Sequence, residues 1–325
     1  MYLTVRMIIA AVAGVLFLWF ALRQIDAFFQ KRGWTSGVSK AGRILSQYSL
    51  VLLVLAILIP VSAIERKIIF VPLSYPSRTW TAAEIPGCVQ DVYMTLPSGD
   101  RLHGCYIEPN REPGQKPDCY ILYFHGNGGN LTYYIDELEG MVRNLNAAVL
   151  CVDYSGYGQS EGEPSEYQLY RDGAAAMKKI LELSGQRPND IVVTGMSLGG
   201  AVATEIALKM QKSGTPVKAL ILECTFSSIP RMASELLPML PSRWLLSTRF
   251  DTNSKLREYN GPLFISHGDA DRVVSYNHAK LNDQAARTVA DRNGPYQFLT
   301  IPYGMHAAYF TDEYFDQVRR FLEKI

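Results

Sequence analysis

A five-residue segment combines the features that a serine nucleophile needs. It runs from Gly195 to Gly199, reads Gly-Met-Ser-Leu-Gly, and lies between an apolar run, Ile191 to Thr194, and a helical pattern that begins at Leu198. Glycines beside the serine permit a turn so tight that larger side chains would collide with neighbouring backbone. Backbone N–H groups at the helix start favour negative charge developing beside Ser197. This strand–turn–helix context predicts Ser197 as a nucleophile.

A serine hydroxyl needs a base to become reactive. When a serine occupies such a turn, the acid and then the histidine follow it along the chain. Of the five histidines, His306 follows the predicted strand Gln297 to Ile301 directly. Ligands of open parallel sheets bind at the carboxyl ends of the strands, so His306 is the predicted base. His278 remains an alternative, although its position in a predicted helix is also typical of a surface residue.

The acid that orients the histidine must come from the end of another strand. Asp269 and Asp271 both follow the predicted strand Pro262 to Ser266. We expect the turn between them to bring one carboxylate toward the site and to leave the other to cap the next helix. Glu223 also ends a predicted strand and is a further alternative, with hydrogen bonding to nearby loop backbone as its simpler role. Asp251 lies between strands and is predicted to be structural.

Two N–H groups should stabilise the oxyanion that forms during acyl transfer. One is the backbone N–H of Leu198, directly after the nucleophile. The second should come from the glycine-rich loop His125 to Asn130, which follows the predicted strand Cys119 to Phe124. We assign it to the backbone N–H of Asn127. No Gly-Lys-Ser/Thr sequence follows the loop, which argues against a phosphate site.

From Ile68 onward, short β-rich runs alternate with amphipathic helical runs such as Tyr167 to Leu183 and Leu198 to Lys212. Nearly continuous apolar strands separated by helices predict an α/β fold with a mostly parallel sheet covered on both faces. A small helical cap is expected at about 228–260, where apolar residues favour an acyl chain over a charged peptide. The predicted strands are Asp91–Leu96 and Leu102–Glu108, which form a hairpin, and then Cys119–Phe124, Ala147–Val152, Ile191–Thr194, Ala219–Leu222, Pro262–Ser266 and Gln297–Ile301.

Two apolar stretches precede the α/β pattern. The second, residues 44–64, contains 21 residues without a formal charge, and the first, residues 2–22, carries only Arg6. About 20 apolar residues cross a hydrocarbon core, so both stretches are candidate transmembrane helices. A signal peptide remains an alternative for the first. These features predict a membrane anchor at 1–67 and a catalytic domain at 68–325.

The loop between the two apolar stretches is basic. It contains five Lys or Arg residues (Arg23, Lys31, Arg32, Lys40 and Arg43) and one acid, Asp26. Short basic loops stay in the cytoplasm, so two spans would place the catalytic domain on the extracytoplasmic side.

Composition narrows the other possibilities. The 32 Lys and Arg residues nearly balance 31 Asp and Glu residues, so no basic field exists to recruit nucleic acid. The five cysteines form no Cys-x-x-Cys pair, which argues against zinc and thioredoxin chemistry. Cys119 and Cys151 lie in apolar runs and are expected to be buried. Cys88 and Cys105 flank the predicted hairpin, and the sequence leaves open whether they form a disulfide.

Together these motifs resemble the α/β-hydrolase superfamily, and within it the membrane-anchored members of the serine-aminopeptidase-like group. The resemblance covers Ile68 to the C-terminus, and it implies Asp271, the second aspartate of the HGDAD motif, as the acid. It also implies no metal or organic cofactor. The family usually carries arginine where this chain has Ser155, a position that we interpret as structural. The motifs are HGNGGN (125–130), DYSGYGQS (153–160), GMSLGG (195–200), HGDADRVV (267–274) and GMH (304–306).

The sequence therefore predicts a membrane-associated serine hydrolase that cleaves a carboxylic ester or thioester, with a lipid or an acylated protein as the candidate substrate. Its triad would be Ser197, His306 and Asp271. A peptidase is the first alternative, because relatives in the group include aminopeptidases. A non-catalytic membrane scaffold is the second, and the complete triad argues against it. The oligomeric state is not determined by the sequence.

Overall fold

The computed structural model describes residues 65–74, 88–112, 115–236, 242–307 and 310–325, together with residues 20, 24, 27, 31, 32 and 238. The chain divides into two compact units, Met1–Glu65 and Arg66–Ile325, and the second carries the sheet. Apart from Phe20, both candidate transmembrane segments, residues 2–22 and 44–64, lie outside the described residues. Within the part that is described, none of the helices has both the length and the apolar character that a membrane span requires.

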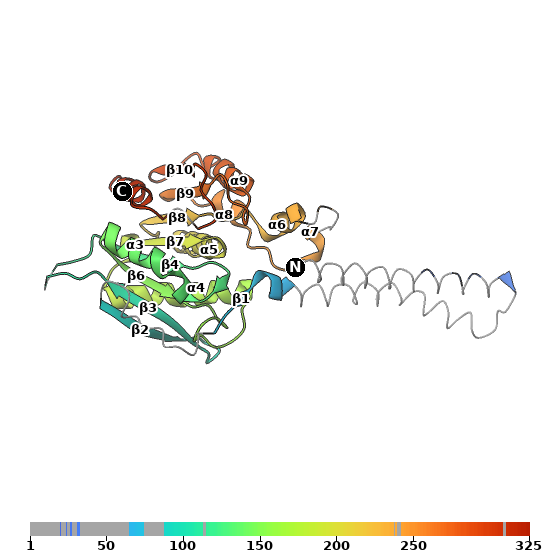
Figure 1. Ribbon diagram of the computed structural model, residues 1–325, viewed down its shortest axis with the longest axis horizontal. Helices are drawn as coiled ribbons and strands as arrows, with labels where there is room; N and C mark the ends of the chain where they lie inside the picture. Colours follow the sequence, from blue (N-terminus) through green and yellow to red (C-terminus); the bar gives the residue numbers. More distant parts are fainter. Residues whose placement is uncertain are drawn as a thin grey trace. The chain divides into compact units, whose positions relative to one another are not determined.

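Eight strands form one twisted sheet in the order β10-β9-β8-β7-β4-β6-β3-β2, which Figure 1 shows from one edge to the other. Neighbours from β10 to β6 are parallel, whereas β3 is antiparallel to both β6 and β2. The mostly parallel sheet predicted from the sequence is confirmed. The strands are β2 (Cys88–Thr95), β3 (Arg101–Glu108), β4 (Cys119–Phe124), β6 (Ala147–Val152), β7 (Ile191–Met196), β8 (Ala219–Glu223), β9 (Leu263–Gly268) and β10 (Tyr296–Ile301).

Helices cover both faces of the sheet and create two hydrophobic cores. Leu122 of β4 lies in the core beneath α4 and α5, and its neighbour Tyr123 lies in the core beneath α3 and α10. This alternation is what strands buried on both faces require. The helices are η2 (Leu131–Tyr134), α3 (Ile135–Leu145), α4 (Glu166–Ser184), η3 (Pro188–Asp190), α5 (Leu198–Lys212), α6 (Ile229–Leu236), α7 (Ser242–Leu245), α8 (Thr252–Leu256), α9 (Tyr276–Arg287) and α10 (Asp312–Leu322).

The four cysteines whose side chains are described are free thiols buried in the protein. Cys119 and Cys151 are buried as expected. Cys105 is also a free thiol, so it forms no disulfide with Cys88 in this structure. In the hairpin, the backbone of Cys88 pairs with Glu108 rather than with Cys105.

In its described residues, the connection between β8 and β9 contains three helices: α6, α7 and α8. Its two ends are held together by backbone hydrogen bonds, from Ile229 N to Arg249 O (2.9 Å) and from Asn253 N to Ser227 O (3.0 Å). We call these paired residues the neck of the cap. α8 includes Asn253 of the neck and packs against α5 and α9, so it belongs to the layer that covers the sheet.

A second, two-stranded sheet was not predicted from the sequence. Its strands are β1 (Val71–Pro72) and β5 (Gly128–Gly129), which run parallel. β5 lies within the glycine-rich loop after β4, so a segment from the start of the catalytic unit pairs with that loop.

Candidate active site

The predicted nucleophile lies on a strained turn. Ser197 follows β7 directly, precedes the first residue of α5, and has φ +53° and ψ −114°. A positive φ is rare outside glycine and costs on the order of 1–3 kcal/mol. The backbone N–H of Ser197 donates to Glu223 O at the end of β8 (2.8 Å), which fixes the turn to the neighbouring strand.

The glycines around Ser197 are required by close backbone approach. A Cβ at Gly199 would lie 1.9 Å from Phe124 O, and a Cβ at Gly195 would lie 2.3 Å from Gly199 O. Real Cβ atoms do not approach backbone oxygens so closely, so the sequence-based reason for these glycines is confirmed. The same contact brings the start of α5 against the end of β4, where the predicted oxyanion loop begins.

His306 and Asp271 form a hydrogen-bonded pair. Nδ1 of His306 lies 2.7 Å from Oδ2 of Asp271. Their two loops are also joined by backbone, because Ala270 N donates to Gly304 O (3.1 Å). The imidazole is partly exposed whereas the carboxylate is buried. This geometry suits a carboxylate that selects the tautomer of a base.

The surroundings of Asp271 keep its carboxyl ionised. Oδ1 accepts from the N–H groups of Val273 (2.8 Å) and Val274 (3.0 Å), and Oδ2 lies 3.2 Å from His267 Nε2. Burial raises the pKa of Asp271, but the hydrogen bonds from His267 and His306 outweigh it and hold that pKa well below its ordinary value.

Asp269 has a role that the sequence did not predict. Its Oδ1 accepts from the N–H of Tyr303 (2.6 Å), in the loop that carries His306. The expectation that the other aspartate caps the next helix is wrong, because Ser275 caps α9 and accepts from Asn277 N. Asp269 instead joins the end of β9 to the base's loop.

The carboxyl group of Glu223 is engaged in the core rather than at His306. Its Oε1 accepts from the hydroxyl of Tyr314. Burial raises the pKa of Glu223 to about 8, so the side chain is largely protonated at neutral pH. A neutral carboxyl group cannot stabilise an imidazolium as an ionised one does, which disfavours Glu223 as the acid.

The remaining alternatives have other partners. His278 is only 1% exposed, and its Nδ1 lies 2.8 Å from Ser227 Oγ at the neck of the cap. The expectation of a surface position for His278 is therefore wrong. Asp251 caps α8 by accepting from Ser254 N (3.0 Å), the structural role predicted for it.

The nucleophile turn and the His306–Asp271 pair meet at the end of β8. Cys224 follows Glu223, whose backbone oxygen accepts the hydrogen bond from Ser197 N. The Sγ of Cys224 lies within 4.8 Å of a carboxylate oxygen of Asp271 and a ring nitrogen of His306. Thiol, carboxylate and imidazole are also metal-ligand types. The 2.7 Å hydrogen bond between Asp271 and His306 already uses their facing atoms, so this group fits an acid–base pair better than a cation site.

Three tyrosine hydroxyls fix the carbonyl groups of the loop that contains Asn127. Tyr154 donates to His125 O (2.8 Å), and Tyr157 donates to Asn127 O (2.9 Å). Tyr134 donates to Gly128 O (2.9 Å). Tyr154 and Tyr157 belong to the DYSGYGQS motif, and the sequence alone indicated no role for either residue. Paired tyrosines three residues apart, one strand away from a glycine-rich loop, are the signal that could have suggested one.

The imidazole of His125 sets the direction of the next peptide unit. Its Nδ1 lies 2.8 Å from Gly126 O, and its ring packs among tyrosines, with Tyr154 4.3 Å away between centroids. In a trans peptide the C=O of Gly126 and the N–H of Asn127 point in opposite directions. The Asn127 N–H therefore points away from the His125 ring, as an outward-facing donor must.

The buried carboxylate of Asp153 contacts His125 and the residue that follows the glycine-rich loop. Its Oδ1 accepts from Leu131 N (2.7 Å) and lies 3.6 Å from His125 Nε2, and its Oδ2 lies 3.6 Å from His103 Nδ1. Burial lowers the pKa of His125, so its ring stays neutral at pH 7. Ser155, where the family usually carries arginine, donates from its N–H (2.7 Å) and its Oγ (3.0 Å) to Asp172, as a structural position would.

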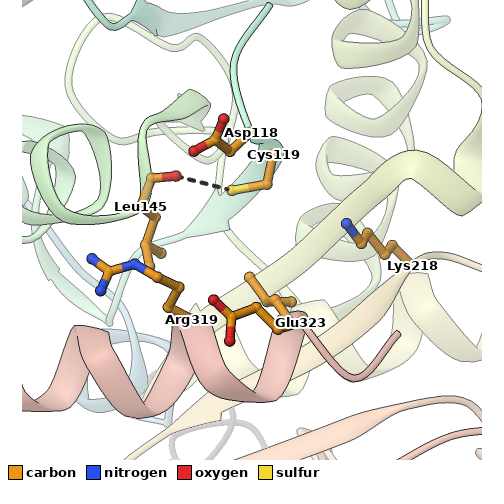
Figure 2. A pocket seen from close by; sticks show the side chains of 7 residues that line it. Asp118, Cys119, Leu145, Lys218, Arg319 and Glu323 are labelled. Carbon is orange, nitrogen blue, oxygen red and sulfur yellow. Dashed lines mark hydrogen bonds between the residues drawn. The ribbon is translucent and has the colours of Figure 1, made fainter.

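A cavity of about 340 Å³ lies near the amino ends of the strands, whereas these residues follow their carboxyl ends. Cys119, at its wall, opens β4, whereas the loop with Asn127 follows the end of that strand. In Figure 2, Arg319 extends from α10 and Glu323 from the C-cap of that helix, and the dashed line marks Cys119 Sγ donating to Leu145 O (3.8 Å). This cavity is separate from the candidate active site.

This chain is similar to known proteins in sequence and in fold. A family model described as alpha/beta hydrolase fold matches residues 120–253. The alpha/beta hydrolase domain-containing protein WAV2 of Arabidopsis thaliana is 31% identical over 268 residues, which cover 75% of this chain and 82% of that protein. The chain belongs to the α/β-hydrolase superfamily.

Solved structures have a similar fold. The Pyrococcus furiosus esterase Pf2001 has a TM-score of 0.59 at 17% identity, covering 78% of this chain and 98% of its own. Est1E from Butyrivibrio proteoclasticus, solved with ferulic acid, has a TM-score of 0.58 at 21% identity, covering 72% of this chain and 98% of its own. At these identities the likeness concerns the fold of the α/β-hydrolase.

Proposed function

We propose that this α/β-hydrolase is a serine hydrolase that cleaves carboxylic esters or thioesters through an acyl-enzyme. The observation that carries the proposal is the 2.7 Å hydrogen bond between His306 and the ionised Asp271, beside a strained turn that presents Ser197. Strain of this kind persists where the surrounding structure imposes it, and it is typical of active sites. The esterases among the solved relatives are consistent with this reaction.

In the proposed reaction, Ser197 Oγ attacks the carbonyl carbon and His306 Nε2 takes its proton. The tetrahedral oxyanion accepts from the backbone N–H groups of Asn127 and Leu198. His306 then protonates the leaving alcohol or thiol. Water hydrolyses the acyl-enzyme by the reverse transfers, and Asp271 stabilises the imidazolium in both halves. Every proton in this scheme is carried by His306, so no metal or organic cofactor is needed.

A fluorophosphonate probe tests the proposal directly. We expect it to label the wild-type protein at Ser197 and to leave Ser197→Ala unlabelled. A panel of p-nitrophenyl esters, matching thioesters and aminoacyl anilides then assigns the reaction. Faster turnover of anilides than of esters would establish the peptidase alternative. A wild-type protein that neither reacts with the probe nor hydrolyses any substrate would leave the scaffold alternative.

We further propose that the enzyme recognises its substrate by an acyl chain. Leu236 of the cap is 64% exposed, and Leu245 and Leu246 are half-buried. Other apolar cap residues on which this expectation rests (Leu237, Met239 and Leu240, and the side chain of Trp244) lie outside the described residues. Higher kcat/KM for medium-chain than for acetyl esters would support an acyl site, and equal values would remove the argument for it.

Membrane association, with the catalytic domain on the extracytoplasmic side, is the last part of the proposal. It rests on the two apolar stretches and on the basic loop between them. Protease added to intact cells should then digest the hydrolase domain. Protection of the domain until the membrane is opened would place it in the cytoplasm.

A further inference from the structure

Residues 69–74, which we call the strap, are bonded along their length to the loop that contains Asn127. Ile69 O accepts from Asn127 Nδ2 (3.1 Å), and Val71 N donates to Asn127 O (3.1 Å). Leu73 N donates to Gly129 O (2.9 Å). These bonds engage both the backbone and the side chain of the residue to which we assign an oxyanion donor.

The strap also joins this loop to a second one. Leu73 O accepts from Asn130 Nδ2 (3.0 Å) and from Gly158 N (3.1 Å). Gly158 follows Tyr157, whose hydroxyl donates to Asn127 O. One carbonyl of the strap therefore connects the glycine-rich loop with the loop whose tyrosine holds it.

A buried side chain fixes the strap itself. Phe70 is 3% exposed and packs edge-on against Phe250, with ring centroids 6.2 Å apart. Val71 and Leu73 are each 44% exposed. The strap is thus anchored by Phe70 and by the partly buried Ile69, and it holds the loop through backbone atoms rather than through its exposed side chains.

Peptide geometry links these bonds to the proposed chemistry. The C=O of Asn127 points opposite to the N–H of Gly128, and the C=O of Gly126 points opposite to the N–H of Asn127. Bonding Asn127 O to Val71 and Gly126 O to His125 therefore fixes both peptide planes around Asn127. Oxyanion donors must be held in position before the reaction, and a misplacement of about 1 Å can cost about 10²-fold in rate.

We propose that the strap is a positioning segment that holds the N–H of Asn127 in the orientation that stabilises the oxyanion. This inference rests on the proposed hydrolase function. It adds to that site a segment far upstream in the sequence, since Leu73 precedes Asn130 by 57 residues. It makes the strap a determinant of kcat rather than of substrate binding.

The test is a pair of substitutions at one exposed position in the full chain. Leu73→Pro removes the N–H that donates to Gly129 O, whereas the matched control Leu73→Thr keeps it. Asn130→Asp is an independent variant: it loses the donor to Leu73 O but keeps the oxygen that accepts from Thr132 N (3.0 Å). We would measure kcat and KM for a p-nitrophenyl ester, the Ki of an alkyl boronic acid, and the melting temperature. The boronate forms a tetrahedral adduct whose oxygen occupies the oxyanion position.

For Leu73→Pro and Asn130→Asp we expect kcat to fall about 10- to 100-fold with KM within about threefold of wild type. The boronate Ki should rise by a similar factor, and Leu73→Thr should match wild type. Wild-type kcat and Ki in a folded Leu73→Pro protein would overturn the inference, and Asn130→Asp decides if that variant does not fold. A loss of kcat without a rise in Ki would also overturn it. A wild-type protein without activity or probe labelling would instead refute the proposed function and, with it, this role.

Discussion

Replacement of Asp271 by asparagine should stabilise the wrong tautomer of the His306 imidazole without disturbing the fold. In wild type, Oδ1 accepts from Val273 N and Val274 N, and Oδ2 faces His306 Nδ1. Asparagine has only one acceptor oxygen. The two backbone donors will retain it, so the amide NH₂ must take the place of Oδ2. An NH₂ group facing Nδ1 forces that nitrogen to accept, and the ring proton moves to Nε2, which then cannot take the proton of Ser197.

The expected loss follows from this tautomer. An analogous substitution in another serine hydrolase triad lowers kcat by about 10⁴. At about 1.36 kcal/mol per tenfold change, this corresponds to roughly 5.5 kcal/mol of transition-state stabilisation. Substrate contacts are not altered, so KM should change little.

The assay is hydrolysis of a p-nitrophenyl ester, with the melting temperature as the measure of folding. Asp269→Asn is the matched control, because its retained oxygen can still accept from Tyr303 N, and we expect kcat within about tenfold of wild type. Glu223→Gln should behave similarly, because glutamine resembles the protonated acid. The opposite result would show that Glu223 is the acid and that the reasoning is wrong. In that case Asp271→Asn would keep more than about a tenth of the wild-type kcat, and Glu223→Gln would lose about 10³-fold or more.

Three further predictions concern the nucleophile, the buried acid and the turn. Ser197→Ala and His306→Ala should each lower kcat by about 10⁴–10⁶ without unfolding, and wild-type ester hydrolysis by either variant would refute its assignment. The pKa of Glu223 is about 8 in the folded protein against an ordinary 4.5, so between these values the folded protein keeps a proton that the unfolded chain releases. The contribution of Glu223 to the free energy of unfolding therefore falls as the pH rises through this range. The melting temperature of Glu223→Gln minus that of wild type should therefore increase from pH 5 to pH 8, about the range between the two pKa values, and a difference independent of pH would contradict the burial of a neutral acid. Gly199→Ala should destabilise the protein by about 2–4 kcal/mol or prevent folding, because its methyl group would meet Phe124 O at 1.9 Å; a denaturation midpoint equal to that of wild type would show that the turn can relax.

The sheet could be predicted from the sequence because its strands are buried on both faces. Such strands read as continuous apolar runs, and β4 and β6 begin and end at the predicted residues. α5 also has its predicted bounds, Leu198–Lys212. The pairing of His306 with an aspartate after β9 followed from the rule that strand ends converge at one edge of a parallel sheet.

Long-range hydrogen bonds could not be predicted in the same way. Tyr157 donates to a carbonyl 30 residues earlier, and no periodicity in the sequence encodes a hydroxyl–carbonyl contact of this kind. The same holds for the bond that Tyr303 N donates to Asp269 Oδ1, which takes the place of the helix cap that local spacing favoured. His278 was expected at the surface because it lies in a predicted helix, whereas Ser227 in the neck of the cap contacts its ring and covers that face of the helix.

The closed neck of the cap makes the segment beyond it exchangeable. Ile229 and Arg249 are bonded to each other, so the chain leaves the hydrolase unit and returns to it at nearly the same point. Segments inserted at such points can change in length at small cost, because each doubling of a flexible loop adds only about 0.6 kcal/mol of closure entropy. Evolution or an engineer can therefore replace residues 230–248 with another cap while β8 and β9 keep Asp271 in place. If the cap binds the acyl chain as proposed, substrate preference can change there while the triad stays in place.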